Sequence, residues 1–233
     1  MIVAIDSSTD TASLALGQDG KVLVETSWRC GQNHSVELLP RLTQLLDEAK
    51  VSLKDTSCVI VAKGPGSFNG LRVGLATAKG IAFSLSIPII GISSLEMEAY
   101  GHADTGLPVC PIFNAGRGEI AAALYQKMNS GWYQHATEHI TTVEALRKEI
   151  TEKTLFCGEY VTTIAHQLKK VLKEKAVIAP DHMRSAGSLI ELAQPRIAAG
   201  DYDDPTTLQP IYLRRPHITT PKRRQKFTNG GLK

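Results

Sequence analysis

An acidic residue followed at once by hydroxyl side chains stands near the start of the chain. Asp6 ends a short apolar run, and Ser7, Ser8, Thr9 and Thr11 come directly after it. An acid at the tip of a strand, followed by hydroxyl side chains in the next turn, is typical of the start of a phosphate-binding loop. The sequence therefore makes Asp6 and Ser7 candidates for contacting a nucleotide cofactor.

The same turn lacks the glycines that phosphate-binding loops use. No glycine lies between Asp6 and Gly17, so few backbone amides can close around a phosphate group there. A role for Asp6 as a turn-former or cap is therefore an equally good interpretation. We assign no catalytic residue, and the pattern disfavours ATP hydrolysis by this chain alone.

Two other motifs match functional patterns only formally. HATEH (135–139) fits the HxxEH pattern of inverted zinc proteases, which needs a helix to bring both histidines to one face. The aromatic and threonine residues around it predict a strand, in which the two histidines are about 13 Å apart. GPGSFNG (64–70) lacks the lysine and adjacent hydroxyl of a Walker loop. We predict no metal site in this chain.

The segment 64–80 predicts a tight turn followed directly by a helix. Within it, Gly70, Gly74, Ala78 and Ala82 recur every four residues, and this smooth stripe lets another element approach the helix backbone closely. Glycine inside a helix costs about 0.5 to 1 kcal/mol relative to alanine, so packing must offset the loss. The stripe faces either the chain's own sheet or a partner helix.

A second apolar helix is predicted at 35–50. It and the helix at 71–85 are more apolar than covering one sheet face requires, so the pair could form a four-helix bundle with another subunit. Such a bundle would bury about 800 Å² per partner. Gly74→Leu would then abolish pairing and leave the chain soluble. The predicted interface residues are Leu38, Leu42, Leu45, Gly70, Gly74 and Ala78.

The order of apolar segments predicts an α/β fold with two lobes. Residues 1–104 read as three strands followed by alternating helices and strands, and residues 105–216 repeat this order loosely. Each part is thus expected to be a ribonuclease-H-like lobe, a mixed sheet with helices on its faces. Residues 217–233 form a separate basic tail, which we expect to be disordered.

Composition is that of a globular protein, with 42% hydrophobic and 21% charged residues. No apolar run approaches the roughly 18 residues of a membrane span, and no leader pattern opens the chain, so we expect a cytoplasmic protein without membrane contact. The cysteines are far apart and form no CxxC pair, which predicts reduced thiols. They are Cys30, Cys58, Cys110 and Cys157.

Charge is distributed unevenly along the chain. From Arg214 to the end there are seven basic residues and no acidic one, so the remainder carries about −4 of a total of +3. The tail could touch RNA phosphates, although a tail that is simply solvated is the favoured interpretation.

Taken together, these segments resemble the TsaB family of the bacterial tRNA threonylcarbamoyladenosine pathway. The similarity covers IVAIDSSTDTASLAL and NHSVELLPRLTQLL and, most specifically, VAKGPGSFNGLRVGLATAKGIAFSLSIPIIGISSLE. FNAGRGEIAAALY and QPIYLRR match more loosely. The family usually has an aspartate and an arginine where this chain has Asn114 and Gly116, so the chain departs from the pattern at that loop.

The resemblance implies a two-lobed actin-like (ASKHA) fold and a non-catalytic role. TsaB proteins support a TsaD-like transferase, which works with a TsaE-like ATPase to form N6-threonylcarbamoyladenosine at position 37 of tRNAs reading codons that begin with adenine. The chain would dimerise with itself in isolation, meet the transferase through the same surface, and reach tRNA indirectly. No cofactor is required by this chain, while ATP or ADP at the partner interface stays open.

A different class of function also fits the sequence. An independent ATP-dependent kinase or hydrolase of the actin-like superfamily would use Asp6 and the turn at 114–118. Direct RNA binding by the basic tail is a third hypothesis.

Overall fold

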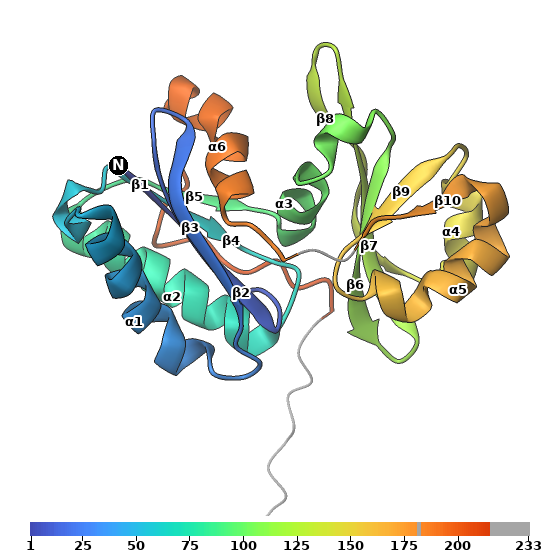
Figure 1. The fold of residues 1–233 in the computed structure, drawn as a ribbon, viewed down its shortest axis with the longest axis horizontal. Coiled ribbons are helices and arrows are strands. Elements are labelled where there is room, and N and C mark those ends of the chain that lie inside the picture. Colours follow the sequence, from blue (N-terminus) through green and yellow to red (C-terminus); the bar gives the residue numbers. More distant parts are fainter. Residues whose placement is uncertain (181–182, 215–233) are drawn as a thin grey trace, which may run out of the picture.

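Two lobes lie side by side in the computed structural model, which describes residues 1–180 and 183–214 (Figure 1). Each lobe contains a five-stranded mixed sheet. In both sheets the first strand is central, pairs antiparallel with the second strand and parallel with the fourth. This repeated order confirms the predicted duplicated ribonuclease-H-like α/β fold.

The first sheet has the strand order β3-β2-β1-β4-β5. Its central strand is buried along its whole length because other strands flank it and helices cover both faces. Strands buried on both faces read as continuous apolar runs rather than alternating ones, which explains the run that ends at Asp6. The strands are β1 (Ile2–Asp6), β2 (Thr11–Gln18), β3 (Lys21–Arg29), β4 (Cys58–Ala62) and β5 (Ile89–Ile92).

The second sheet has the order β10-β9-β6-β7-β8. Its long hairpin of β7 and β8 projects from the lobe (Figure 1). The HATEH motif lies within β8, so the predicted strand is confirmed. The strands are β6 (Val109–Gly116), β7 (Glu119–Met128), β8 (Gly131–Thr141), β9 (Thr154–Cys157) and β10 (Ala176–Ile178).

Two helices cover the outer side of each lobe. In Figure 1, α1 and α2 lie side by side against the first sheet, and α4 and α5 lie against the second. The helices are α1 (His34–Ala49), α2 (Phe68–Leu85), α3 (Ser94–Tyr100), α4 (Val143–Glu149), α5 (Val161–Leu172) and α6 (Gly187–Ala199). Short 3₁₀ turns are η1 (Leu53–Asp55), η2 (Ala103–Thr105) and η3 (Lys173–Lys175).

Each sheet is covered on its inner side by a helix from the other half of the sequence. The predicted boundary at residue 105 therefore does not separate the two lobes. Leu95 and Ala99 of α3 pack in the core of the second sheet, although the sequence analysis placed them in the first lobe. Leu189 and Ile190 of α6 pack on the first sheet, and Leu208 joins the same lobe. Sequence order alone could not show this, because a helix is free to cover either sheet once a connection crosses between them. The predicted tail, 217–233, lies outside the described residues.

The first helix differs from its predicted start. Asn33, rather than Ser35, occupies the N-cap position, and its side chain makes no capping hydrogen bond. Instead, His34 anchors this end of α1, since its Nε2 lies 2.7 Å from the Thr9 carbonyl oxygen. The helix ends at Lys50, whose left-handed backbone (φ 55°) lets its amide bond back to the last turn. The β1–β2 turn and α1 are therefore held together.

All four cysteines are free and buried, as predicted. Burial raises the pKa of the Cys30 and Cys58 thiols to about 11, so both stay protonated at neutral pH. Among the described residues, no helix is both long and apolar enough to cross a bilayer.

Candidate functional site

Asp6 is fully buried where β1 ends. Its Oδ1 accepts hydrogen bonds from the Ser8 amide at 3.0 Å and from the Ser8 hydroxyl at 2.6 Å. In this geometry a carboxylate fixes the backbone two residues further along the chain. The interpretation of Asp6 as a turn-former is therefore confirmed.

The other oxygen of Asp6 is paired with an arginine from the far end of the sequence. Arg184 Nε lies 3.0 Å from Asp6 Oδ2, and Arg184 Nη2 donates to Ser8 Oγ at 3.1 Å. Glu98 Oε2 lies 3.7 Å from the same nitrogen, and the guanidinium stacks over Phe113 at 4.8 Å. Because Asp6 already neutralises a buried cation, it does not offer a free carboxylate to a metal-bound phosphate.

Ser7, the second cofactor candidate, packs directly on α2. Its hydroxyl donates to the Gly70 carbonyl oxygen at 2.8 Å. A Cβ at Gly70 would clash with the Ser7 backbone oxygen, and a Cβ at Gly74 would clash with the Ser7 hydroxyl. Glycine at these two positions lets the β1–β2 turn lie against the helix backbone.

The six residues predicted as partner contacts lie inside the first lobe, so that assignment is wrong for these side chains. Leu38, Leu42 and Leu45 are at most 2% exposed and join the core over the first sheet. Gly70 and Gly74 meet Ser7, and Ala78 is fully buried. The stripe faces the chain's own turn and sheet, because only residues without long side chains leave room for that turn.

A different apolar surface lies on the outside of the same two helices. Val36 and Leu39 on α1 are 66% and 54% exposed, and Phe83 on α2 is 56% exposed. Ala76 and Gly80 precede Phe83 at helical spacing and are also exposed. A Cβ at Gly80 would meet no atom of residues 1–180 or 183–214 within 4 Å. We call these five residues the outer α1–α2 face.

A cleft of about 360 Å³ lies where the β1–β2 turn meets the second lobe. Thr9 Oγ1 donates to Glu159 Oε1 at 2.6 Å, and this bond joins the two lobes. Asp10 and Glu159 both line the cleft, so its charged groups are carboxylates, which repel phosphate. Asn114 lines the same cleft from β6.

The β6–β7 turn is held by hydrogen bonds of its own residues. Asn114 Oδ1 accepts a hydrogen bond from the Gly116 amide at 2.8 Å. Gly116, Arg117 and Gly118 all have positive φ, which a tight turn of this kind requires. Arg214 bonds the Ala115 carbonyl oxygen and ion-pairs with Glu119, so this turn is held by the end of the described chain.

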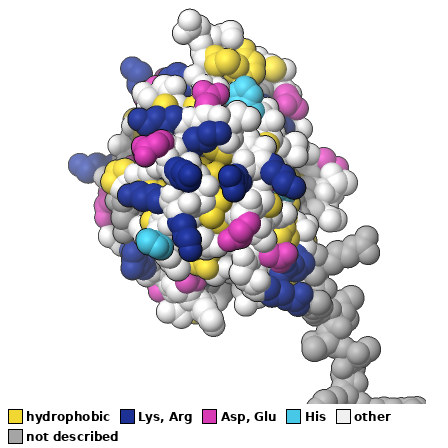
Figure 2. All heavy atoms as spheres, turned by 90° about the vertical axis from the view of Figure 1, so that its right-hand side faces the viewer, with side chains coloured by type: hydrophobic (Ala, Val, Ile, Leu, Met, Phe, Trp, Pro, Cys, Tyr) yellow, Lys and Arg dark blue, Asp and Glu magenta, His cyan; other side chains and the backbone are white. Residues whose placement is uncertain are grey.

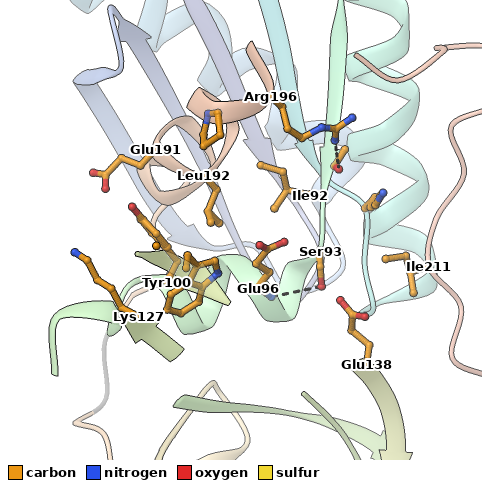
Figure 3. Close-up of a pocket in the computed structure, with 15 residues that line it drawn as sticks. Ile92, Ser93, Glu96, Tyr100, Lys127, Glu138, Glu191, Leu192, Arg196 and Ile211 are labelled. Carbon is orange, nitrogen blue, oxygen red and sulfur yellow. Dashed lines mark hydrogen bonds between the residues drawn. The ribbon is translucent and has the colours of Figure 1, made fainter. Parts of the chain in front are cut away.

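A larger cavity of about 700 Å³ opens between the lobes on the side of α3 and α6. Figure 3 shows Glu96 reaching into it from α3 and Glu138 from β8. Burial raises the pKa of Glu96, and the carboxylate of Glu138 raises it further. Burial also opposes ionisation of Glu138, but hydrogen bonds from Ser93, its own backbone and Tyr125 outweigh it and lower that pKa.

Comparison with known proteins identifies the family. Residues 29–221 match the family model of TsaD, tRNA N6-adenosine threonylcarbamoyltransferase. The Bacillus subtilis tRNA threonylcarbamoyladenosine biosynthesis protein TsaB is 35% identical, over 91% of this chain and 93% of that protein. The chain belongs to the TsaB family. The Escherichia coli TsaB protein is 29% identical, over 91% of this chain and 94% of its own length.

A solved structure shows the same fold for this TsaB-family chain. YeaZ from Pseudomonas aeruginosa superposes with a TM-score of 0.77 at 24% sequence identity. The alignment covers 91% of this chain and 99% of that one. The two-lobed arrangement is thus shared along nearly the whole described chain.

One group of side chains in this TsaB-family chain has the elements of a metal site. Ligand atoms of Glu98, His102 and Cys157 lie within 4.8 Å of one another. The Arg184 guanidinium is beside Glu98 and already brings positive charge to it. A bound cation would have to overcome that repulsion, so the arrangement is better described as a buried ion cluster.

Glu96→Gln is expected to stabilise the fold at pH 7. A carboxyl whose pKa is raised by folding is disfavoured when ionised, so its contribution to stability falls as pH rises through the folded pKa. The amide removes this penalty, and we expect Tm to rise by about 2 °C at pH 7 and by less at pH 4. Calorimetry at both values checks this, with the exposed Glu152→Gln as control. An equal shift at both pH values would contradict it.

Proposed function

We propose that this chain is a non-catalytic partner of a TsaD-like transferase. The pair would act in forming N6-threonylcarbamoyladenosine at position 37 of tRNAs that read codons beginning with adenine. The names of the Bacillus subtilis and Escherichia coli relatives supply the pathway, and the matched family model supplies the transferase. A TsaE-like ATPase and a cytoplasmic location belong to the same proposal.

The observation that carries the pairing is the outer α1–α2 face. Large apolar side chains exposed on a globular protein can mark interaction sites, and the outer sides of these two helices carry three of them. Gly80 adds a second reason, because a helical glycine costs about 0.5 to 1 kcal/mol and no neighbour among the described residues needs the space. Close approach of a partner helix would account for it. We therefore assign the TsaD-like protein to this face, with a second copy of the chain there in isolation.

The alternative, an independent ATP-dependent kinase or hydrolase, gains no support from the candidate residues. Asp6 is neutralised by Arg184, Ser7 is bonded to α2, and the cleft above them presents Asp10 and Glu159. Phosphate sites instead use cations and backbone amides. ATP or ADP at the partner interface stays a prediction, since it would involve groups from both chains.

Gly80→Gln is expected to abolish pairing while raising stability. The new side chain enters open space in the isolated chain, and glutamine favours a helix by about 0.5 to 1 kcal/mol over glycine. Against a closely packed partner helix the same side chain would be an obstruction. Light scattering on a sizing column, with the TsaD-like protein from the same source, measures the 1:1 species, and urea unfolding measures stability.

Thr163→Gln, on the exposed side of α5, is the matched control for an added glutamine. It should leave the 1:1 species unchanged. Full pairing by Gly80→Gln would show that the outer α1–α2 face is not the docking surface. Failure of the wild-type chain to pair at all would remove the proposed function itself.

A further inference from the structure

Basic side chains gather on the outside of the second lobe. Figure 2 shows this side of the molecule, with lysine and arginine side chains spread across it and fewer acidic ones between them. All of those used below are exposed. We call them the α4–α5 basic face: Arg147, Lys148, Lys153, Lys169, Lys170 and Lys173.

The basic face contrasts with the rest of the protein. Residues 143–178 carry seven basic and five acidic side chains, whereas residues 1–142 and 179–213 together carry 12 basic and 18 acidic ones. Solubility alone does not require the positive charges of a protein surface to concentrate on one pair of helices. The contrast gives this lobe a positive outer side on an otherwise acidic body.

The acids on this side are partly engaged already. Glu144 accepts a hydrogen bond from Gln167 at 2.8 Å, which also ties α4 to α5, and Glu149 lies 3.0 Å from His139. Glu159 turns to Thr9 in the cleft. Within the described part of the chain, none of the six basic side chains forms an ion pair, so their charge is available to a partner.

Local structure keeps the cations together. The buried side of α5 is formed by Val161, Ile164, Leu168 and Leu172, so Lys169, Lys170 and Lys173 point outward within about one helical turn. Thr154 pairs with Ala176 in the parallel β9–β10 ladder, which sets Lys153 beside the end of η3. The cations thus form a continuous surface rather than a run in the sequence.

We propose that the α4–α5 basic face binds the phosphate backbone of the RNA substrate. This inference rests on the proposed function, which makes the substrate a tRNA. Lysine-rich surfaces bind phosphates as point charges without reading sequence, and that suits a component that positions RNA rather than reacting with it. It also places the RNA contact on a rigid helix pair, at the opposite side of the molecule from α1 and α2 (Figure 1).

The test compares three full-length triple variants that each lose three positive charges. They alter the basic face (Lys169→Gln, Lys170→Gln, Lys173→Gln), the first lobe (Lys21→Gln, Lys50→Gln, Lys54→Gln) and the basic tail (Lys222→Gln, Arg223→Gln, Arg224→Gln). Fluorescence anisotropy with a labelled tRNA transcript carrying adenosine 37 gives affinity from 50 to 200 mM salt, for the chain alone and with the transferase.

The basic-face variant should bind about tenfold more weakly at 50 mM salt, and its slope of log affinity against log salt should fall by about 2. The first-lobe variant should change affinity less than about twofold. Equal losses in all variants, a loss confined to the tail variant, no RNA binding by wild type, or binding of wild type only to phosphatidylglycerol vesicles would each overturn the inference.

Pairing with the transferase is measured on the same samples by light scattering. If the basic-face variant still forms the 1:1 species and loses RNA, the inference stands independently of the docking surface. If wild type binds RNA through this face but never pairs, the proposed function fails while the RNA site remains.

Discussion

Replacing Arg184 with methionine is expected to cost about 3 to 5 kcal/mol of unfolding free energy. The guanidinium side chain is 1% exposed and lies 3.0 Å from Asp6 and 3.7 Å from Glu98. Methionine fills similar volume but leaves buried carboxylates without their cation. Folded proteins are stable by only about 5 to 15 kcal/mol, so we expect a large fraction of the variant molecules to unfold at low urea concentration. Equilibrium unfolding followed by circular dichroism measures the loss.

Arg196→Met is the matched control, since Arg196 pairs with Asp201 and Asp203 but is 29% exposed. A partly solvated pair of this kind is worth about 1 kcal/mol or less. Adding Asp6→Asn and Glu98→Gln to Arg184→Met should restore part of the lost stability, because it removes the two buried negative charges that face Arg184. An Arg184→Met chain as stable as the Arg196→Met chain would refute a structural role for the ion pairs of Arg184 with Asp6 and Glu98.

The contacts of Arg184 also explain how the two lobes are held relative to each other. Asp6 and Ser8 belong to the β1–β2 turn, Glu98 to α3, and Phe113 to β6 of the second sheet. One side chain therefore contacts three elements that meet at the centre of the molecule.

Much of the fold was predictable from local signals. The strand that ends at Asp6 and the strand containing HATEH each depend on residues within about ten positions, and both were confirmed. The turn predicted at 114–118 is shorter than expected, because β6 continues to Gly116. The packing of α3 on the second sheet and of α6 on the first could not be predicted. The apolar face of a helix shows that it covers a sheet but not which sheet it covers.

The candidate site was harder to predict, for two physical reasons. Arg184 is far from Asp6 in sequence and follows no motif, so nothing local joins the two. The helix α2 also carries two rows of small residues, Gly70 with Gly74 and Ala76 with Gly80. Periodicity gives the spacing of each row but not which row turns inward. The β1–β2 turn decides that, by occupying the space beside Gly74.

Gly74→Leu is therefore expected to unfold the chain rather than merely prevent pairing, which corrects the prediction from sequence. Its first side-chain atom would already clash with the Ser7 hydroxyl, and the remaining atoms would enter the core around Ile5. Overpacking of this kind costs about 3 kcal/mol. Gly80→Leu is the control, since the same side chain there enters open space. Urea unfolding should show a large loss for the first variant and none for the second.

A smaller pair of changes isolates the contact itself. Gly74→Ala adds only the clashing Cβ, and we expect it to lose about 1 to 2 kcal/mol in the wild-type background. Ser7→Ala removes the hydroxyl and leaves its Cβ 3.5 Å from the new methyl group, an ordinary van der Waals contact. Gly74→Ala should then cost almost nothing in the Ser7→Ala chain. If Gly74→Ala lowered the unfolding free energy equally in both backgrounds, the Ser7 hydroxyl would not be the reason that position 74 requires glycine.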